Sequence, residues 1–331
     1  FDVVTDARPG QIKKRFARAF IIGRRFRLAH VHFGGGKYIE VATFRRISDQ
    51  AARETPAGES VPAHPYGTPE EDAFRRDITI NALYYDVIHD AVIDYVGGLV
   101  DIARRTVRVI GNPADRFTED PVRIWRVLRY AARLGFAVEE AAEREIPGHA
   151  HLIAASSAAR LYEELNKDLA FETRPVFETL RRYAILRHIF GKAGEAYEAD
   201  AELFSRLSSL LDIVDRARTT GFLPMLEEMY AVLFWPWAQP LLETSGVDYH
   251  KALSDAFRDA GMRVNIPRNL RADSSQVLII VAAMDRALRT GRMRWSLLQK
   301  PHFGPAQRLY FLFFKGRLPE KDESFEALFR Q

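Results

Sequence analysis

The hydrophobic pattern of this 331-residue chain changes once, between about residue 110 and residue 118. Before that point short β-branched and aromatic runs predict strands, and ARPGQIKKRFARAF has helical spacing. The strand-like runs are FIIG, LAHVHF, YIEVATF, INALYYDVI and AVIDYV. After the change, apolar residues recur every three to four positions, as in SSQVLIIVAAMDRALRTG, with no convincing strand. The pattern predicts an α+β head followed by an all-helical body.

Composition narrows the class of protein and the kind of metal that it could bind. The chain contains no cysteine, so a metal would be held by carboxylates or histidines, which favours a hard ion such as Mg²⁺. No apolar run approaches the roughly 20 residues of a membrane-spanning helix, and no leader peptide is recognisable. We therefore expect a cytoplasmic protein that makes no contact with a membrane.

Basic residues are concentrated in two regions. Residues 1–50 hold eleven Lys or Arg against four acids, and residues 101–135 hold eight against four. Such clusters are typical of proteins that bind a phosphate-bearing partner, and a solvated basic surface is the alternative. The proline-rich, apolar-poor segment over residues 47–73 has no role that the sequence identifies.

Two strand-like tripeptides each carry one acid between apolar neighbours, Phe1-Asp2-Val3 and Ile39-Glu40-Val41. In a strand the acid points away from the face of its neighbours, so two adjacent strands of this kind would form a metal site. The alternative is that each acid simply lies on the wet face of a half-buried strand.

A third acid follows two arginines in EEDAFRRDITINALYY. The planar forks of Arg75 and Arg76 suit a triphosphate, and Asp77 could bind metal or accept a hydrogen bond from a ribose hydroxyl. The alternative for this stretch is an Arg-Asp pair on the surface.

Four arginines occupy one side of the helix that FTEDPVRIWRVLRYAARLG predicts. Arg123, Arg126, Arg129 and Arg133 fall within an arc of about 120° at 100° per residue. These like charges repel unless an anion or acids lie opposite, so the ridge indicates a polyphosphate, a base edge or nucleic acid. Asp120, followed by Pro121, is typical of a helix N-cap, and capping does not exclude a contact with a base.

These segments together resemble the bacterial poly(A) polymerase and tRNA CCA-adding group, the class II nucleotidyltransferases of the polymerase β superfamily. The resemblance rests on FDVVTDA, IEVATFR, EEDAFRRDITINALYY, DYVGGLVDI and EDPVRIWRVLRYAARLGF, in the family's order. GRRFRLAHVHF, RRDITINALYYDV and VRVIGNP are similar to the polyadenylating branch. The resemblance implies a polymerase β-like head with a mixed sheet over residues 1–115, a helical neck that selects the nucleotide over 116–175, and a helical RNA-binding body over 176–331.

The resemblance also implies roles for individual residues. Asp2 matches the second acid of the family's DxD motif, Asp77 the acid of its RRD motif, and Glu40 a third superfamily carboxylate; all three are expected to be catalytic and to bind metal. Asp120 and Arg123 match the pair that selects the base. The full set of expected nucleotide-binding residues is Arg76, Asp120, Arg123, Arg126, Arg129 and Arg160.

The sequence departs from the family pattern in two places. The glycine-rich GGxVRDxLLG stretch and the first aspartate of DxD have no counterpart here, so we expect either a longer parent protein with a truncated head in this chain or weak catalysis. Trp125 stands where the family commonly has an aliphatic residue.

The implied function is magnesium-dependent, template-independent transfer of AMP from ATP to RNA 3′ ends, with a part in mRNA processing. The implied partners are ATP and an RNA 3′ end, and we expect a monomer. One alternative is a CCA-adding tRNA nucleotidyltransferase, which shares every motif; another is a catalytically inactive RNA-binding homologue. The sequence does not identify protein partners, the RNAs that are tailed or the tail length.

Overall fold

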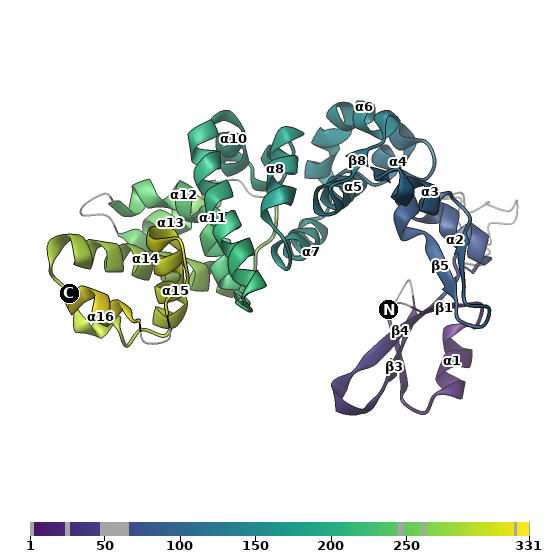
Figure 1. Cartoon of the computed structure of the whole chain (residues 1–331), viewed down its shortest axis with the longest axis horizontal. Helices are drawn as coiled ribbons and strands as arrows, with labels where there is room; N and C mark the ends of the chain where they lie inside the picture. The colour runs from purple at the N-terminus through teal and green to yellow at the C-terminus, as the bar shows by residue number, and fades with distance from the viewer. Residues whose placement is uncertain are drawn as a thin grey trace, which may run out of the picture. The chain divides into compact units, whose positions relative to one another are not determined.

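The computed structural model describes residues 3–23, 27–46, 66–243, 248–259, 263–320 and 323–330. The chain divides into two units, Phe1–Pro113 and Ala114–Gln331. The strands near the N-terminus and the long succession of helices after them can be followed in Figure 1. The three-part division at residues 115 and 175 stays a prediction.

A mixed four-stranded sheet opens the first unit, in the order β1-β4-β3-β2. β1 pairs with β4 in parallel, and the other two neighbouring pairs are antiparallel. Alternation gives the sheet a buried face with Ala29 and Val31, against which Ile12 of the first helix packs. The elements are β1 (Val3–Thr5), α1 (Pro9–Arg15), β2 (Ala19–Ile22), β3 (Leu28–His32), η1 (Gly34–Gly36) and β4 (Tyr38–Thr43).

The rest of the first unit combines short helices with an antiparallel hairpin. A second small core of Ala73, Ala82 and Ile110 holds these elements together, with Tyr84 and Tyr95 packed against it. The elements are α2 (Pro69–Arg75), η2 (Thr79–Asn81), β5 (Leu83–Asp86), β6 (Ala91–Asp94), α3 (Gly98–Ala103) and β7 (Thr106–Val107).

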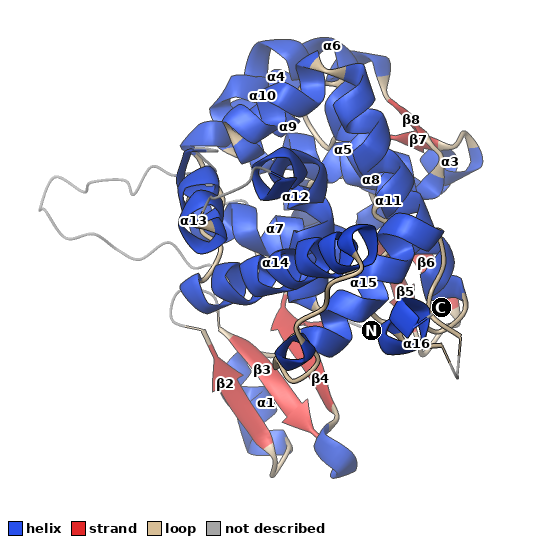
Figure 2. Cartoon of the chain, turned by 90° about the vertical axis from the view of Figure 1, so that its left-hand side faces the viewer, coloured by secondary structure: helices blue, strands red, loops and turns tan. Residues whose placement is uncertain are grey.

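The second unit is almost entirely helical, as the blue ribbons of Figure 2 show. Its buried aromatic side chains include Trp125, Phe177, Tyr230 and Phe311. Its first half comprises α4 (Pro113–Glu119), α5 (Val122–Leu134), β8 (Ala137–Val138), α6 (Glu140–His149), η3 (Ala150–Ala155), α7 (Ala158–Leu169), α8 (Arg174–Arg182) and α9 (Leu186–Phe190). Its second half comprises α10 (Lys192–Ala199), α11 (Ala201–Thr219), α12 (Leu226–Glu243), α13 (Tyr249–Asp259), α14 (Arg268–Thr290), η4 (Trp295–Leu297), α15 (Phe303–Lys315) and α16 (Phe325–Arg330).

The α+β class with an all-helical continuation is confirmed, and two local predictions are corrected. The helix expected over ARPGQIKKRFARAF ends at Arg15, because Ala19 and Phe20 already pair with β3. The helical part contains β8, whose two residues are too short to show a period in the sequence. Within the described ranges, no helix is both long and apolar enough to cross a membrane.

Candidate functional site

Glu40 lies on the face of the sheet opposite α1. It is directly opposite His30 in the antiparallel register of β3 and β4, and the His30 Nε2 to Glu40 Oε1 distance is 3.2 Å. The side chain of Glu40 is 42% exposed, so it is accessible to solvent or a ligand. Asp2, its predicted metal-binding partner, lies outside the described residues.

The backbone on both sides of Asp77 is fixed by a short antiparallel pairing. The amide of Ile110 donates to the carbonyl of Asp77 at 3.0 Å, and the amide of Thr79 donates to the carbonyl of Arg108 at 3.0 Å. The Thr79 hydroxyl donates to Asp101 at 2.6 Å, and Arg108 also binds Asp101. These contacts hold Asp77 on a rigid connection between α2 and η2, as a catalytic carboxylate requires.

Asp72 accepts hydrogen bonds from both arginines of the RRD segment. The distances are 2.7 Å from Arg75 Nη2 and 3.2 Å from Arg76 Nη2, and Tyr84 donates its hydroxyl at 2.8 Å. Burial alone would raise the pKa of Asp72, but Arg75 and the hydrogen bonds lower it below the ordinary value. Arg76 also donates to the carbonyl of Asn81 at 3.0 Å, so its guanidinium is oriented before any ligand binds.

The DYVGGLVDI segment packs against η2, next to the connection that carries Asp77. Asp94 accepts from the amides of Val96, Gly97, Gly98 and Leu99, which ties the hairpin to the start of α3. A Cβ on Gly98 would lie 2.4 Å from the carbonyl oxygen of Thr79. Only glycine therefore allows α3 to approach η2 this closely.

In the second unit, Asp120 and Arg160 meet at the edge of a cavity of about 510 Å³. Arg160 Nη2 donates to Asp120 Oδ2 at 2.5 Å, and the arginine side chain remains 43% exposed. Ser157 caps α7 by accepting from the amide of Arg160, which positions this arginine at the helix start. The cavity is lined by Thr118, Glu119, Asp120, Pro121, Leu152, Ala155, Ser156, Ser157 and Arg160.

The interpretation of Asp120 as a side-chain N-cap is wrong. The N-cap of α5 is Pro121, with no side-chain cap, and only the main-chain carbonyl of Asp120 accepts from the amide of Arg123. The carboxylate is turned to Arg160 because that guanidinium offers a charged donor in place of a backbone amide.

Arg123 is buried on the first turn of α5, close to Asp120. It donates to Glu119 Oε2 at 2.7 Å and to the carbonyl of Arg116 at 3.0 Å, and its Nε lies 3.9 Å from Asp120 Oδ2. The hydrogen bond from Arg123 lowers the pKa of Glu119. The structure thus brings together three of the predicted nucleotide-binding residues, Asp120, Arg123 and Arg160.

Arg129 lies deeper, in a buried network with two acids of α7. Its side chain is 4% exposed, contacts Asp168, and reaches Glu164 Oε2 at 2.5 Å and the Glu164 carbonyl at 2.9 Å. Burial alone would lower the pKa of Arg129, but the two carboxylates raise it. Trp125 donates its indole N–H to Asp168 at 2.6 Å, so the departure from the family's aliphatic residue here completes the network.

The arginine ridge therefore faces acids of its own unit over part of its length. Arg133 donates to the carbonyl of Lys167 at 2.6 Å and lies 3.7 Å from Asp168. Arg126 is less buried than Arg123 and Arg129. The direct contacts of Arg126 and Arg129 with a nucleotide stay predictions.

Neither Asp72 nor the pair Glu164 and Asp168 was identified from the sequence. In each case the signal was present as helical spacing: Asp72 precedes Arg75 and Arg76 by three and four positions, and the α7 acids are four apart beside an apolar stripe. Glu164 and Asp168 pair with Arg129 of α5, which is distant in the chain, so spacing alone did not reveal this pairing.

The chain matches known family models in both units. A model of the Poly A polymerase head domain matches residues 1–108, and one described as the probable RNA and SrmB-binding site of polymerase A matches residues 135–195.

Similar proteins cover most of the chain. Poly(A) polymerase I of Escherichia coli O6:H1 is 35% identical over 343 aligned positions, which span 94% of this chain and 70% of that protein. The CCA-adding enzyme of Lactobacillus helveticus is 34% identical over 166 positions, 50% of this chain and 40% of that enzyme. A crystal structure of a tRNA nucleotidyltransferase complexed with a primer tRNA and an incoming ATP analog has the same fold, with a TM-score of 0.65, 23% identity, and coverage of 95% of this chain and 85% of that one.

Proposed function

The chain belongs to the poly(A) polymerase family of nucleotidyltransferases, and on this premise we propose that it adds AMP from ATP to RNA 3′ ends without a template and with Mg²⁺. In this reaction the RNA 3′ oxygen forms a bond to the α-phosphorus of ATP, the bond from that phosphorus to the pyrophosphate oxygen breaks, and the hydroxyl loses its proton. The work of the enzyme is then to position two anionic substrates and to balance their charge.

The observation that carries the proposal is the Asp120–Arg160 pair at the mouth of its cavity, with Arg123 close to Asp120. Without a template, protein side chains must distinguish the bases. A carboxylate accepts from an exocyclic amino group, and a guanidinium donates to the neighbouring ring nitrogen. Adenine offers both groups on its Watson–Crick edge, whereas guanine and uracil offer a carbonyl where the amino group is needed.

Cytosine also presents an amino group beside a ring acceptor, and this favours CCA addition as the second candidate function. The pair by itself would admit both adenine and cytosine, and the size of the cavity would have to separate them. The preference for AMP rests on the resemblance to the polyadenylating branch and on the extent of the match to poly(A) polymerase I.

We also propose that residues of the first unit bind phosphate and metal. Arg76 would bind the triphosphate, and Asp2, Glu40 and Asp77 would hold Mg²⁺, which supplies positive charge at the reacting phosphate and lowers the pKa of the attacking hydroxyl. β1 and β4 are parallel neighbours with Val3 opposite Val41, and Asp2 and Glu40 immediately precede these valines in the sequence. Among the described residues no three histidine or acidic side chains form a metal cluster, so the proposed set depends on Asp2. Reaction with ATP and RNA implies a cytoplasmic location.

The Asp77→Asn variant tests this assignment. It should abolish AMP addition while RNA affinity stays within about twofold, because the amide has similar volume but loses the charge that binds the metal. Asp90→Asn is the matched control: Asp90 is on the hairpin turn with a φ of 50°, which asparagine tolerates. Full activity of Asp77→Asn would refute the metal assignment. RNA binding by the unaltered protein without any addition would favour the inactive homologue.

The Asp120→Ala variant tests base selection. Loss of one charged hydrogen bond to the base should reduce the preference for ATP over GTP by about 10- to 100-fold in kcat/KM, which corresponds to roughly 1.5–3 kcal/mol. An unchanged ratio of kcat/KM values would show that base selection lies elsewhere.

A further inference from the structure

The sheet face opposite α1 carries aromatic and imidazole rings beside Glu40. β2, β3 and β4 lie side by side (Figure 2), and in their antiparallel register Phe20 is opposite His30. Between β3 and β4, His30 is opposite Glu40 and His32 is opposite Tyr38. Alternate residues of a strand share a face, so all five side chains lie on one side of the sheet.

The turn between β3 and β4 fixes the register that places His30 opposite Glu40. The amide of Phe33 donates to the carbonyl of Lys37 at 2.8 Å, which closes the turn. Two glycines of η1 have φ values of 74° and 76°, in the left-handed region that favours glycine. A shift of one residue would move Glu40 to the opposite face of the sheet, so this turn decides whether the two side chains meet.

The imidazole ring of His30 is held from two sides. It is stacked on the ring of Tyr38, with the centroids 4.5 Å apart and an angle of 11° between the planes. Its Nε2 lies 3.2 Å from Glu40 Oε1. The side chain of His30 is only 18% exposed, whereas Phe20 and Tyr38 on the same face are 56% and 50% exposed. The ring therefore presents Nε2 to Glu40 from a fixed position.

The contact between His30 and Glu40 adds little to the fold. Backbone pairing already joins β3 and β4 over four residue pairs, and an ion pair with an exposed partner contributes little to stability. Its effect falls on the conformation of Glu40. Binding of a metal by an exposed glutamate costs the conformational entropy of its side chain, and a partner that orients the carboxylate beforehand reduces this cost.

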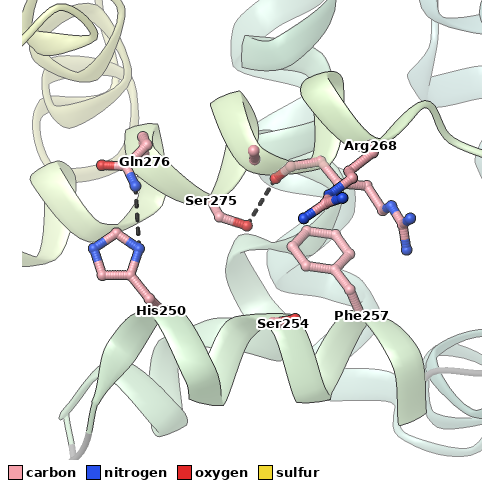
Figure 3. Close-up of a pocket in the computed structure, with 8 residues that line it drawn as sticks. His250, Ser254, Phe257, Arg268, Ser275 and Gln276 are labelled. Atoms are coloured by element: carbon pink, nitrogen blue, oxygen red, sulfur yellow. Dashed lines mark hydrogen bonds between the residues drawn. The ribbon is translucent and has the colours of Figure 1, made fainter.

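Other histidines of the chain contact polar side chains, and these contacts join helices. His250 of α13 lies 3.1 Å from the amide nitrogen of Gln276 of α14, across the cavity between these helices (Figure 3). His302, just before α15, lies 3.3 Å from Asp273 of α14. Neither Gln276 nor Asp273 belongs to the predicted metal-binding set. The contact of His30 differs because its partner is a predicted metal ligand.

We propose that His30 is a positioning residue of the metal site, which donates from Nε2 to Glu40 and holds the carboxylate in the orientation that binds Mg²⁺. The inference rests on the proposed function for the role of Glu40 as a metal ligand. A carboxylate has two oxygens with several acceptor positions, so the contact with His30 leaves capacity for the metal. His30 acts through Glu40 and binds neither the metal nor ATP itself.

Three variants of the full chain separate this role from packing of the ring. His30→Phe keeps a planar ring against Tyr38 and removes Nε2. His30→Gln loses the ring and keeps an amide N–H that can donate to the carboxylate. His32→Phe is the matched control, because His32 lies on the same face of β3 and contacts Tyr38 but is not opposite an acid.

The assay measures binding of Mn²⁺, which takes the same oxygen ligands as Mg²⁺, by electron paramagnetic resonance without ATP or RNA. Circular dichroism verifies that each variant folds. His30→Phe should raise Kd for Mn²⁺ by about 10- to 100-fold, which is the usual cost of losing a partner that orients a metal ligand, while His30→Gln and His32→Phe should each change Kd by less than about threefold. In AMP addition, His30→Phe should raise the Mg²⁺ concentration that gives half the maximal rate, with KM for RNA unchanged.

A double-mutant cycle tests whether His30 acts through Glu40. In a Glu40→Gln background, His30→Phe should have no further effect on Kd for Mn²⁺. A full effect there would overturn the proposal, because His30 would then bind the metal itself. Equal losses in His30→Phe and His32→Phe would also overturn it, since packing of the rings would be the cause.

Failure of the positioning role can be told from failure of the proposed function. If His30→Phe leaves Kd for Mn²⁺ unchanged while Glu40→Gln raises it, the role of His30 is refuted and the metal site stands. If Glu40→Gln leaves Kd unchanged, Glu40 is not a metal ligand, and both assignments fail. Because Mn²⁺ binding is measured without ATP and RNA, an unaltered chain that binds Mn²⁺ and adds no AMP would refute the proposed function alone.

Discussion

Replacing Arg129 with methionine should strongly destabilise the helical unit. Methionine has a similar length but no charge, so the fully buried Asp168 would lose the guanidinium that contacts it directly and keep Trp125 and, at 3.7 Å, Arg133. Among the described residues, Glu164 would keep Lys167 at 2.9 Å as its ion-pair partner. Removing one partner of a buried ion pair costs about 3–5 kcal/mol. For a unit of this size, each kcal/mol lowers Tm by about 2–4 °C, so we expect Tm to fall by roughly 6–20 °C.

Differential scanning calorimetry would measure this change, with Arg126→Met as the control on the same helix. Arg126 is partly exposed, and we expect its replacement to cost less than about 1 kcal/mol. Below the lowered Tm, Arg129→Met and Arg126→Met should also differ in their effect on enzyme kinetics, because Arg129 holds α5 against α7 through Glu164 and Asp168. A Tm within 2 °C of the unaltered protein, together with a raised KM for ATP, would refute this reasoning and show that Arg129 is mainly a nucleotide contact.

Three further outcomes follow from the first unit. Gly98→Ala should destabilise it by about 1–3 kcal/mol in thermal unfolding and reduce kcat, because the new Cβ would collide with Thr79, whereas Gly10→Ala, with open space around its Cβ, should do neither. The pKa of Asp72 is lowered in the folded protein, so this carboxylate stabilises the unit at pH values above its ordinary pKa, and the contribution should be lost as pH falls below about 4. If the free energy of unfolding of an Asp72→Asn protein fell by the same amount over that pH range, the assignment would be contradicted. Removal of Mg²⁺ with EDTA should stop AMP addition and restoration of Mg²⁺ should recover it, measured on extended primers, and addition that persists in EDTA would exclude the proposed carboxylate site.

Much of the fold could be predicted because local patterns agreed with the final structure. The strands around LAHVHF and YIEVATF have the expected alternation, with Ala29 and Val31 buried and His30 turned to Glu40. The end of α1 could not be predicted from spacing, because β-sheet pairing of Ala19 with Val31 overrides the helical period.

The candidate site was only partly predictable. The arginine ridge of α5 is periodic, but what lies opposite each arginine depends on α7, about 40 residues later. Asp168 of α7 binds Arg129 and Trp125, so this part of the ridge is structural. Asp120, just before α5, binds Arg160 of α7 at the edge of a cavity. The spacing of charged residues predicts which face of a helix carries them. Which of these charges remain available to a ligand depends on how the neighbouring helix packs.

The central claim, template-independent AMP addition, is tested most directly by the products of the reaction. The protein would be incubated with Mg²⁺ and either ATP alone or CTP plus ATP, on an unstructured RNA and on a tRNA that lacks its CCA end, and the products would be sequenced. The account predicts runs of adenosine on the unstructured RNA, formed with ATP alone and not requiring CTP. Products limited to CCA on the tRNA would contradict it.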